Sequence, residues 1–199
     1  NGQVATALAD FFLEVKATDI SKEQLAQAVQ KSNISYSLQP AEKTDFPDSS
    51  FELVTVAQAI HWFDFEAFYK EVKRVLKPGG YLAVIGYGLF RSNSETNRII
   101  DHLYKNLVGP YWYPERQYLE EKYETISFPF KEVPTLKFSK REIWSIEQLL
   151  GYLNTWSSVK NYERQKRENP VVLVKKQLEK SFGARGEVEI PTLFKLGRV

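Results

Sequence analysis

The chain has 199 residues, of which 43% are hydrophobic, so it is long and apolar enough to bury the core of one domain. Its 27 basic and 25 acidic side chains give a formal net charge of +2, which favours neither an acidic nor a basic partner. The absence of cysteine excludes disulfides, thiolate metal sites and cysteine nucleophiles. Because the chain has no methionine and starts at Asn1, we expect it to derive from a longer polypeptide.

The first forty residues alternate between helix and strand signals. We expect an amphipathic helix after Gly2, with Val4, Leu8, Phe11 and Phe12 on its apolar side. Short apolar runs then predict strands, and a polar segment between them predicts a helix. The predicted strands are 15–18 and 34–38, and the helix between them is 21–31.

Residues 45–88 carry the clearest pattern. The run 51–57 (FELVTVA) is apolar and β-branched, which predicts a buried strand. Asp64 is a good N-cap for a helix over 65–76, whose apolar residues recur at helical spacing. Pro78 and Gly79 then suit a type II turn before a second strand at 81–85. A strand, helix and parallel strand form a right-handed crossover, so we predict a doubly wound α/β fold, mostly parallel, with helices on both faces.

The segment beyond Gly88 is expected to form a loop and a helix, followed by the aromatic stretch 109–130. An aromatic loop after the fifth strand suits a lid over a small-molecule pocket, although its rings could equally pack the segment onto the core. We predict one domain over 1–199 with a cap insertion at about 89–135. The remaining predictions are a strand at 136–144, helices at 146–159 and 171–182, and strands at 188–190 and 192–199.

Three motifs together point to a family. PDSSFELV at 47–54, AQAIHWFD at 57–64 and VLKPGGYLAV at 75–84 resemble the class I S-adenosylmethionine-dependent methyltransferases. The AQAIHWFD form, with GPYW at 109–112, WSIEQLLGYLNTWS at 144–157 and LFKLGRV at 193–199, is most similar to the branch of yeast-type trans-aconitate methyltransferases and related small-molecule enzymes. The resemblance implies a Rossmann-like sheet of order 3-2-1-4-5-7-6 whose first, central strand is missing from this sequence. We therefore expect further residues before Asn1, since two strand edges would otherwise be exposed.

The resemblance also implies where the cofactor S-adenosylmethionine binds. Asn1, Gly2 and Gln3 resemble the end of the glycine-rich loop, and Asp19 stands where the family binds the ribose hydroxyls. Asp19 could instead cap the next helix. The adenine contact is expected near Ala41 and Glu42, although Pro40 replaces the family's usual acid and Glu42 could be an exposed loop residue. The implied cofactor residues are Gly2, Gln3, Asp19, Ile20, Ala41, Glu42, Gln58 and Ala59.

The methyl acceptor is expected beyond the strand exits. If it is a carboxylate, with an ordinary pKa of ~4, it arrives deprotonated and His61 would orient it; for another nucleophile His61 could be the general base. His61 could also be a structural cap, and Trp62 could be core packing. Arg116 suits a planar carboxylate or a surface ion pair. The candidate acceptor-binding residues are His61, Trp62, Tyr87, Tyr111, Trp112 and Arg116.

We therefore predict S-adenosylmethionine-dependent methyl transfer to a small molecule, a carboxylic acid, by in-line displacement. The Asn/Asp-Pro-Pro-Tyr motif of enzymes that methylate amide or exocyclic nitrogens is absent, which argues against base methylation. The alternatives are a non-catalytic binding protein of the same fold and a nicotinamide-dependent dehydrogenase. We expect a cytoplasmic protein with no metal, nucleic-acid or membrane partner, and the basic excess in 137–199 is interpreted as a solvated face. The pattern predicts no oligomeric state.

Overall fold

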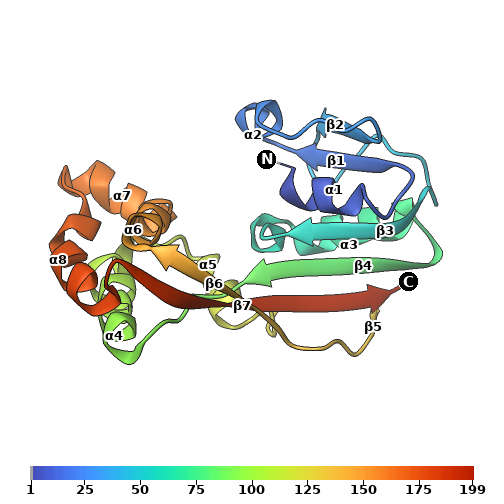
Figure 1. Cartoon of the computed structure of the whole chain (residues 1–199). Helices are drawn as coiled ribbons and strands as arrows, with labels where there is room; N and C mark the ends of the chain where they lie inside the picture. The colour runs from blue at the N-terminus through green and yellow to red at the C-terminus, as the bar shows by residue number, and fades with distance from the viewer. Residues whose placement is uncertain (1) are drawn as a thin grey trace. The chain divides into compact units, whose positions relative to one another are not determined.

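The computed structural model describes residues 2–199 (Figure 1), so the predicted loop position Asn1 lies outside the described residues. By their contacts the residues group into two compact units. The first unit comprises the chain up to Ile85, Ser127–Thr135 and Phe194–Val199, and the second comprises Gly86–Ile126 and Leu136–Leu193. The single-domain assignment with a cap at 89–135 stays a prediction.

The elements follow one another in the alternating order of an α/β chain. They are α1 (Gln3–Leu8), β1 (Val15–Asp19), α2 (Lys22–Ala26), β2 (Ile34–Leu38), β3 (Phe51–Ala57), the 3₁₀ turn η1 (Ile60–Trp62), α3 (Phe65–Val75), β4 (Leu76–Tyr87), α4 (Ser94–His102), the π-helical turn η2 (Leu103–Leu107), the 3₁₀ turn η3 (Gly109–Tyr111), α5 (Arg116–Glu120), β5 (Lys131–Glu132), β6 (Phe138–Ser145), α6 (Ile146–Asn154), α7 (Ser157–Lys166), α8 (Pro170–Phe182) and β7 (Arg185–Arg198).

Strands β1 and β2 form a separate two-stranded parallel sheet. Their register runs from Val15 opposite Ile34 to Asp19 opposite Leu38, so both predicted strands are confirmed and end at the same edge. The helix prediction before them was too long, because α1 ends at Leu8 and leaves the Phe11 side chain 84% exposed. Asp19 therefore stands at a strand end, as the sequence predicted.

Helix α2 is also shorter than the predicted 21–31. It begins after Ser21, whose side chain accepts the N–H of Gln24, and it ends at Ala26. After Ala26 the N–H groups of Gln27 and Ala28 bond to the carbonyls of Gln24 and Leu25 without continuing the α-helix, and the Tyr36 hydroxyl donates to the Val29 carbonyl at 2.7 Å. Local periodicity could not foresee this tertiary hydrogen bond.

The predicted β3–α3–β4 crossover is confirmed, but β4 spans Leu76–Tyr87, so the predicted turn at 77–80 lies within the irregular start of a longer strand. Strands β3 and β4 are parallel, with Leu53 opposite Tyr81 and Ala57 opposite Ile85. Asp64 caps α3 by accepting the Ala67 N–H at 3.0 Å. Gly79 has φ of +79°, the left-handed conformation that the turn requires. Ala57, at the end of β3, therefore lies beside Ile85, near the end of β4.

The larger sheet has the order β3-β4-β7-β5, with β6 also paired to β7. Strand β7 is one continuous strand, where two were predicted on either side of Pro191. Pro191 has no N–H to donate, but its carbonyl accepts the Gly88 N–H at 3.0 Å, so the strand continues through it. Strands β5 and β6 both run antiparallel to β7. The α/β fold is confirmed, but the sheet is mixed rather than mostly parallel. The missing first strand and helices on both faces stay predictions.

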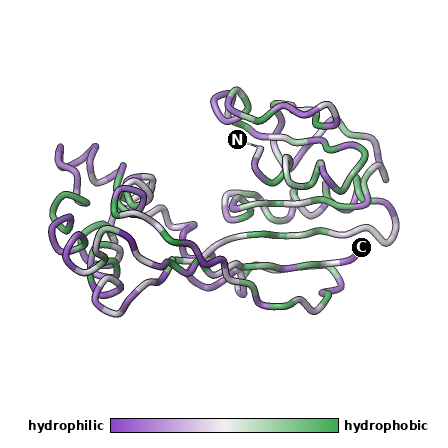
Figure 2. The backbone as a smooth tube through the Cα atoms, in the orientation of Figure 1, coloured by the Kyte–Doolittle hydropathy of each residue, from purple (hydrophilic) through white to green (hydrophobic). Residues whose placement is uncertain are grey.

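The second unit is built around a helical core. Phe90, Leu103, Leu149, Leu153 and Leu178 are each fully buried within it. In Figure 2 the middle of β4 is coloured hydrophobic, whereas α7 is mostly hydrophilic. None of the helices in residues 2–199 has the length and apolar character needed to cross a membrane.

The predicted helix over 146–159 is divided in two. Ser145 and Gln148 form a capping box at its start, as the serine predicted, but α6 ends at Asn154. Trp156 then has an extended backbone with ψ of 134°, and its buried ring packs on Tyr104 at 5.5 Å. Burial of this indole outweighs continuation of the helix.

Candidate functional site

The carboxyl ends of β1 and β2 bring the predicted ribose acid next to the loop that follows β2. Gln39 donates its N–H to the Asp19 carbonyl at 3.2 Å. The Asp19 side chain is partly buried, and its Oδ1 accepts the Ser21 N–H at 2.9 Å. One carboxylate oxygen thus shapes the turn into α2, while Ser21, not Asp19, caps the helix. Ile20 beside it is 77% exposed.

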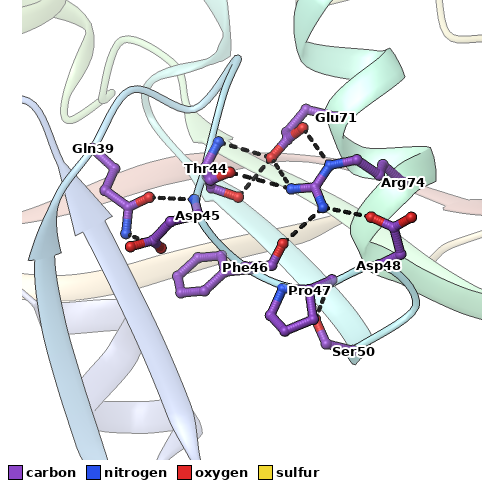
Figure 3. Close-up of polar contacts among 9 residues, drawn as sticks. All are labelled: Gln39, Thr44, Asp45, Phe46, Pro47, Asp48, Ser50, Glu71 and Arg74. Carbon is purple, nitrogen blue, oxygen red and sulfur yellow. Dashed lines mark hydrogen bonds and ion pairs between the residues drawn. The ribbon is translucent and has the colours of Figure 1, made fainter.

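The loop after β2 is fastened to α3 by Glu71 (Figure 3). Glu71 Oε1 accepts both the N–H of Thr44 at 2.8 Å and its hydroxyl at 2.6 Å. Arg74 binds the same carboxylate through Nε at 2.9 Å and Nη2 at 2.6 Å. Glu71 lies between the apolar positions of the helical repeat in α3, where an exposed side chain is expected, but it is only 9% exposed because the loop covers it.

Arg74 extends this attachment along the loop. Its Nη1 donates to the Phe46 carbonyl and to Asp48 Oδ1, both at 2.7 Å, and its Nη2 donates to the Thr44 carbonyl at 3.3 Å. The hydrogen bonds from Arg74 lower the pKa of Glu71 to about 2, against the opposing effect of burial. The same partnership with Glu71 raises the pKa of Arg74. The pair therefore stays ionised at any pH near neutrality.

Two hydrogen bonds between Gln39 and Asp45 hold the ends of the loop after β2 together. The side-chain oxygen of Gln39 accepts the Asp45 N–H at 2.8 Å, and its Nε2 donates to Asp45 Oδ1 at 2.7 Å (Figure 3). Because Gln39 also bonds to the Asp19 backbone, hydrogen bonds and the peptide bond between Thr44 and Asp45 connect α3 to the end of β1.

The predicted adenine residues lie within the span that these contacts hold. Ala41 and Glu42 are partly buried, and Glu42 Oε1 accepts the Asp64 N–H at 3.2 Å. This contact joins the loop after β2 to the start of α3. Glu42 is therefore not a loose loop side chain, and one of its oxygens serves the fold.

The exit of β3 has an unusual backbone. Gln58 has φ of +52°, a conformation that non-glycine residues seldom adopt, and its N–H donates to the Ile85 carbonyl at 2.7 Å. Ala59 then starts η1, which buries His61 to 5% exposure but leaves Trp62 52% exposed. The two rings lie 5.0 Å apart. Trp62 is thus not a core residue, which was the alternative interpretation.

Gly2 has a structural reason to be glycine. Its φ is +73°, and an added Cβ would lie 2.5 Å from the Tyr36 hydroxyl and 3.2 Å from the Ala28 Cβ. Gln3 is exposed at the start of the short helix α1. The hydrogen bonds that join Asp19 to the loop after β2 do not include these two residues.

In the second unit, Arg116 lies on aromatic rings. Its guanidinium carbon is 4.6 Å from the centre of Trp112 and 5.5 Å from that of Tyr104. Its Nε donates to the Tyr104 hydroxyl at 2.9 Å, and that hydroxyl donates to Glu120 Oε1 at 2.7 Å. The alternative of a direct surface ion pair is therefore wrong, since a phenol separates the arginine from the carboxylate.

The other predicted aromatic residues differ in exposure. The Tyr111 ring packs on Tyr162 at 4.9 Å, and Trp112 donates its Nε1–H to the Tyr104 carbonyl at 3.3 Å. Both rings hold the 109–112 segment against its own unit. Tyr87, at the end of β4, is 43% exposed.

Three tyrosines near Arg116 were missed by the sequence analysis. Burial raises the pKa of Tyr104 and of Tyr152 to about 12, and it raises the pKa of Tyr123 as well. The positive charge of Arg116 opposes each of these increases. The residues lie in η2, in the turn after α5 and in α6, so spacing in the sequence carried no signal for them.

The comparisons with known proteins agree with this arrangement. A methyltransferase-domain family model matches residues 1–84. A Dictyostelium discoideum protein described as a methyltransferase is 32% identical over 185 residues, which cover 92% of this chain and 70% of that protein. The chain belongs to the S-adenosylmethionine-dependent methyltransferases. A methyltransferase of Schizosaccharomyces pombe is 29% identical over 157 residues, covering 78% of this chain and 61% of its own length.

The methyltransferase is also similar to a solved structure. A protein from Anaeromyxobacter dehalogenans described as a type II methyltransferase superposes with a TM-score of 0.90 at 36% identity, covering 99% of this chain and 85% of the other. Membership of this family makes the enzyme a methyltransferase that uses S-adenosylmethionine. The dehydrogenase alternative was therefore wrong.

The residues of the first unit fit this cofactor at its ribose. A carboxylate acceptor at a strand end is the group that binds a ribose diol in nucleotide-binding α/β folds. Asp19 has that position, and its bond to Ser21 orients the carboxylate. Residues 2–199 contain no group of three or more His, Cys, Asp or Glu side chains placed to hold a metal ion.

We expect the methyltransferase to lose part of its stability in acid through Glu71. Its pKa in the folded chain, about 2, lies below the ordinary value of 4.5. The unfolded chain therefore takes up the proton first, so the stabilisation is fully present above pH ~4.5 and disappears as the pH falls towards ~2. It should amount to on the order of 2–3 kcal/mol.

Urea denaturation of the wild type and of Glu71→Gln between pH 3 and 7 measures this contribution. The difference in unfolding free energy should shrink as the pH falls. Glu66→Gln, on the exposed face of the same helix, is the matched control. A difference that does not change with pH would contradict the role of the ionised pair.

Proposed function

We propose that this methyltransferase transfers the methyl group to a carboxylate of a small molecule, as in the trans-aconitate methyltransferase branch that its motifs resemble. Arg116 is the observation that carries the proposal. Its guanidinium carbon lies over the Trp112 ring, 4.6 Å from the ring centre, and its Nε donates to the Tyr104 hydroxyl. Among residues 2–199, no hydrogen bond or ion pair is formed with the two terminal guanidinium nitrogens, Nη1 and Nη2, of Arg116.

An arginine in this state is suited to a carboxylate. The guanidinium is planar and presents its donors as a fixed fork, which matches the two oxygens of a carboxylate. Fixing the side chain in advance reduces the entropy lost when an anion binds. The surrounding aromatic rings would exclude water and strengthen the contact.

The proposed cofactor contacts lie in the first unit. We assign the ribose to Asp19 with Ile20 beside it, the adenine to Ala41 and Glu42, and the remaining contacts to Gly2, Gln3, Gln58 and Ala59. The Glu71–Arg74 pair supports this assignment because it holds the loop that contains 41 and 42. When bound, S-adenosylmethionine supplies an activated methyl group.

His61 is proposed to orient the acceptor. In-line displacement depends on alignment of the reacting atoms, and a carboxylate with a pKa of ~4 needs no base at neutral pH. The buried His61 ring beside exposed Trp62 is suited to donate a hydrogen bond from a fixed position. Trp62, Tyr87, Tyr111 and Trp112 complete the proposed acceptor residues, under a lid formed by 109–130.

The remaining expectations belong to the same proposal. The acceptor is a small molecule, the enzyme has no nucleic-acid or membrane partner, and it acts in the cytoplasm. A non-catalytic protein that binds S-adenosylmethionine is the rival, and turnover of any acid by the purified protein excludes it.

Asp19→Asn should weaken S-adenosylmethionine binding by on the order of 1–3 kcal/mol, because the ribose hydroxyls lose a charged acceptor. Asparagine can still accept the Ser21 N–H, so the turn into α2 should survive. Isothermal titration of the full-length protein gives the change in affinity. Glu23→Gln, an exposed neighbour on α2, is the control, and equal affinity of the wild type and folded Asp19→Asn would refute the ribose assignment.

Arg116→Lys should raise the KM for a carboxylic acid roughly tenfold, because lysine loses the bidentate geometry. The assay uses trans-aconitate and its fully esterified analogue as acceptors, and only the free acid should be methylated. Arg98→Lys, at an exposed position on α4, is the matched control. Methylation of neither compound by the wild type, or an unchanged KM in Arg116→Lys, would count against a carboxylate acceptor.

Substitutions of His61 distinguish a residue that orients the acceptor from one that acts as a general base. His61→Gln keeps a donor of similar reach and should retain much of the activity, whereas His61→Ala should lose more. The rate of the wild type should also show no single ionisation near pH ~6.5. If both variants are inactive and such an ionisation is present, His61 is a general base and the acceptor is a hydroxyl or an amine.

A further inference from the structure

Tyr104 lies in the π-helical turn η2 and holds the indole that Arg116 lies over. Its carbonyl accepts the Trp112 Nε1–H at 3.3 Å, and the centres of the two rings are 4.9 Å apart. Trp156 packs edge-on against the Tyr104 ring at 5.5 Å, and Tyr104 is only 6% exposed. Turns of the π type are rare and are often found at functional sites. The ring of Tyr104, and with it the hydroxyl, is therefore held in one place.

The Tyr104 hydroxyl stands between two charged residues of α5. It accepts the Arg116 Nε–H at 2.9 Å and donates to Glu120 Oε1 at 2.7 Å. The direction of both bonds is fixed by chemistry, because a guanidinium can only donate and an ionised carboxylate can only accept. Burial raises the pKa of Tyr104 to about 12, so the phenol keeps the proton that it shares with Glu120. Tyr104 thus links the two residues while it remains neutral.

Without the phenol, the two charges of α5 could meet directly. Arg116 and Glu120 are the first and last residues of this helix, four positions apart, and side chains at this spacing are neighbours on a helix surface. Glu120 is exposed and Arg116 is partly exposed, so neither side chain is enclosed by the core. A direct pair would place the carboxylate on the terminal nitrogens of Arg116, where the acceptor is proposed to bind.

We propose that Tyr104 is a positioning residue of the acceptor site, which keeps the Arg116 guanidinium apart from Glu120 and leaves its terminal nitrogens to the acceptor. Within the described residues the Nε–H binds the phenol, so a carboxylate is bound end-on by Nη1 and Nη2. Glu120 contributes by accepting the phenol proton, which leaves the lone pairs of the oxygen to Arg116. The inference rests on the proposed carboxylate acceptor.

The first test compares Tyr104→Phe with the wild-type full-length protein. Phenylalanine keeps the ring that packs on Trp112 and Trp156 and removes only the hydroxyl. The KM for trans-aconitate should rise about tenfold, as loss of a hydrogen bond to a charged group implies, with kcat and the affinity for S-adenosylmethionine unchanged. Tyr162→Phe is the matched control, since it removes a phenol that binds another carboxylate, Glu168, at 2.9 Å. An unchanged KM in Tyr104→Phe would overturn the inference.

A second substitution distinguishes this role from general support of the fold. If Tyr104→Phe lets Glu120 reach Arg116, removal of that carboxylate in Tyr104→Phe/Glu120→Ala should bring the KM back to within about threefold of the wild type. Glu124→Ala in the same background is the matched control, because Glu124 is exposed but eight positions from Arg116. A KM that stays high in Tyr104→Phe/Glu120→Ala, or one that Glu124→Ala restores equally, contradicts the proposal.

A readout without acceptor separates this inference from the proposed function. The Arg116 guanidinium signals are followed by nuclear magnetic resonance. In Tyr104→Phe the Nη–H signals should shift as these nitrogens bind Glu120, and the added Glu120→Ala should reverse the shift. A shift that survives Glu120→Ala refutes the inference even in an enzyme that methylates acids. A reversed shift in an enzyme that methylates no acid refutes the acceptor proposal and leaves the role of Tyr104 between Arg116 and Glu120 in place.

The proposal can also be tested without changing Tyr104, should Tyr104→Phe fail to fold. In Glu120→Ala the phenol loses the acceptor of its proton and becomes a weaker acceptor for Arg116. The Arg116 Nε–H signal should therefore shift in Glu120→Ala and stay in place in Glu124→Ala. An Nε–H signal that is the same in the wild type and in Glu120→Ala would overturn the inference.

Discussion

The hydrogen bonds of the Arg74 guanidinium are the contacts on which the proposed cofactor-binding edge of the first unit depends. The guanidinium binds the helix that carries it through Glu71, and it binds the loop after β2 through Thr44, Phe46 and Asp48, which lie 26 to 30 positions earlier. A planar group with several donors can hold three loop residues at once only in one arrangement. The hydrophobic face of α3, which anchors the helix, therefore also determines where the loop lies.

Arg116 in the second unit is used in the opposite way. The donors of Arg74 all bind protein acceptors, whereas among residues 2–199 the Arg116 side chain donates from Nε to Tyr104 and lies 4.6 Å from the centre of the Trp112 ring. An arginine whose N–H donors all bind protein acceptors stabilises the fold. An arginine that is held in place but keeps N–H donors available is suited to bind a ligand. This contrast supports a structural role for Arg74 and an acceptor-binding role for Arg116.

Among residues 2–199, positive φ at non-glycine residues occurs at Ser49, Gln58, Lys122, Tyr123 and Arg167, and one of these, Gln58, is a proposed cofactor contact. Gln58 adopts a left-handed conformation directly after β3, and Lys122 and Tyr123 do so after α5. Such residues cost on the order of 1–3 kcal/mol each, so the surrounding contacts must impose them. At Gln58 the bond to Ile85 contributes to this, and at Tyr123 the buried ring against Gly86 does.

The sequence by itself determined the elements whose signals are local. The apolar runs predicted β1, β2 and β3, Asp64 predicted the start of α3, and the Lys-Pro-Gly-Gly turn predicted the left-handed Gly79. These signals were sufficient because they depend on neighbours within a few positions. They also identified the family, and hence the cofactor, through motifs at the strand exits.

Only the tertiary structure decided which polar residues are buried and which aromatic residues meet. Glu71 follows the periodicity of an exposed face, yet a loop folded from 27 positions away covers it. The Tyr36 hydroxyl binds the Val29 carbonyl beyond the end of α2, and Tyr123 reaches Gly86 across 37 positions. Nothing local encodes these contacts, because hydrogen bonds and packing between distant segments exist only once the chain has brought those segments together.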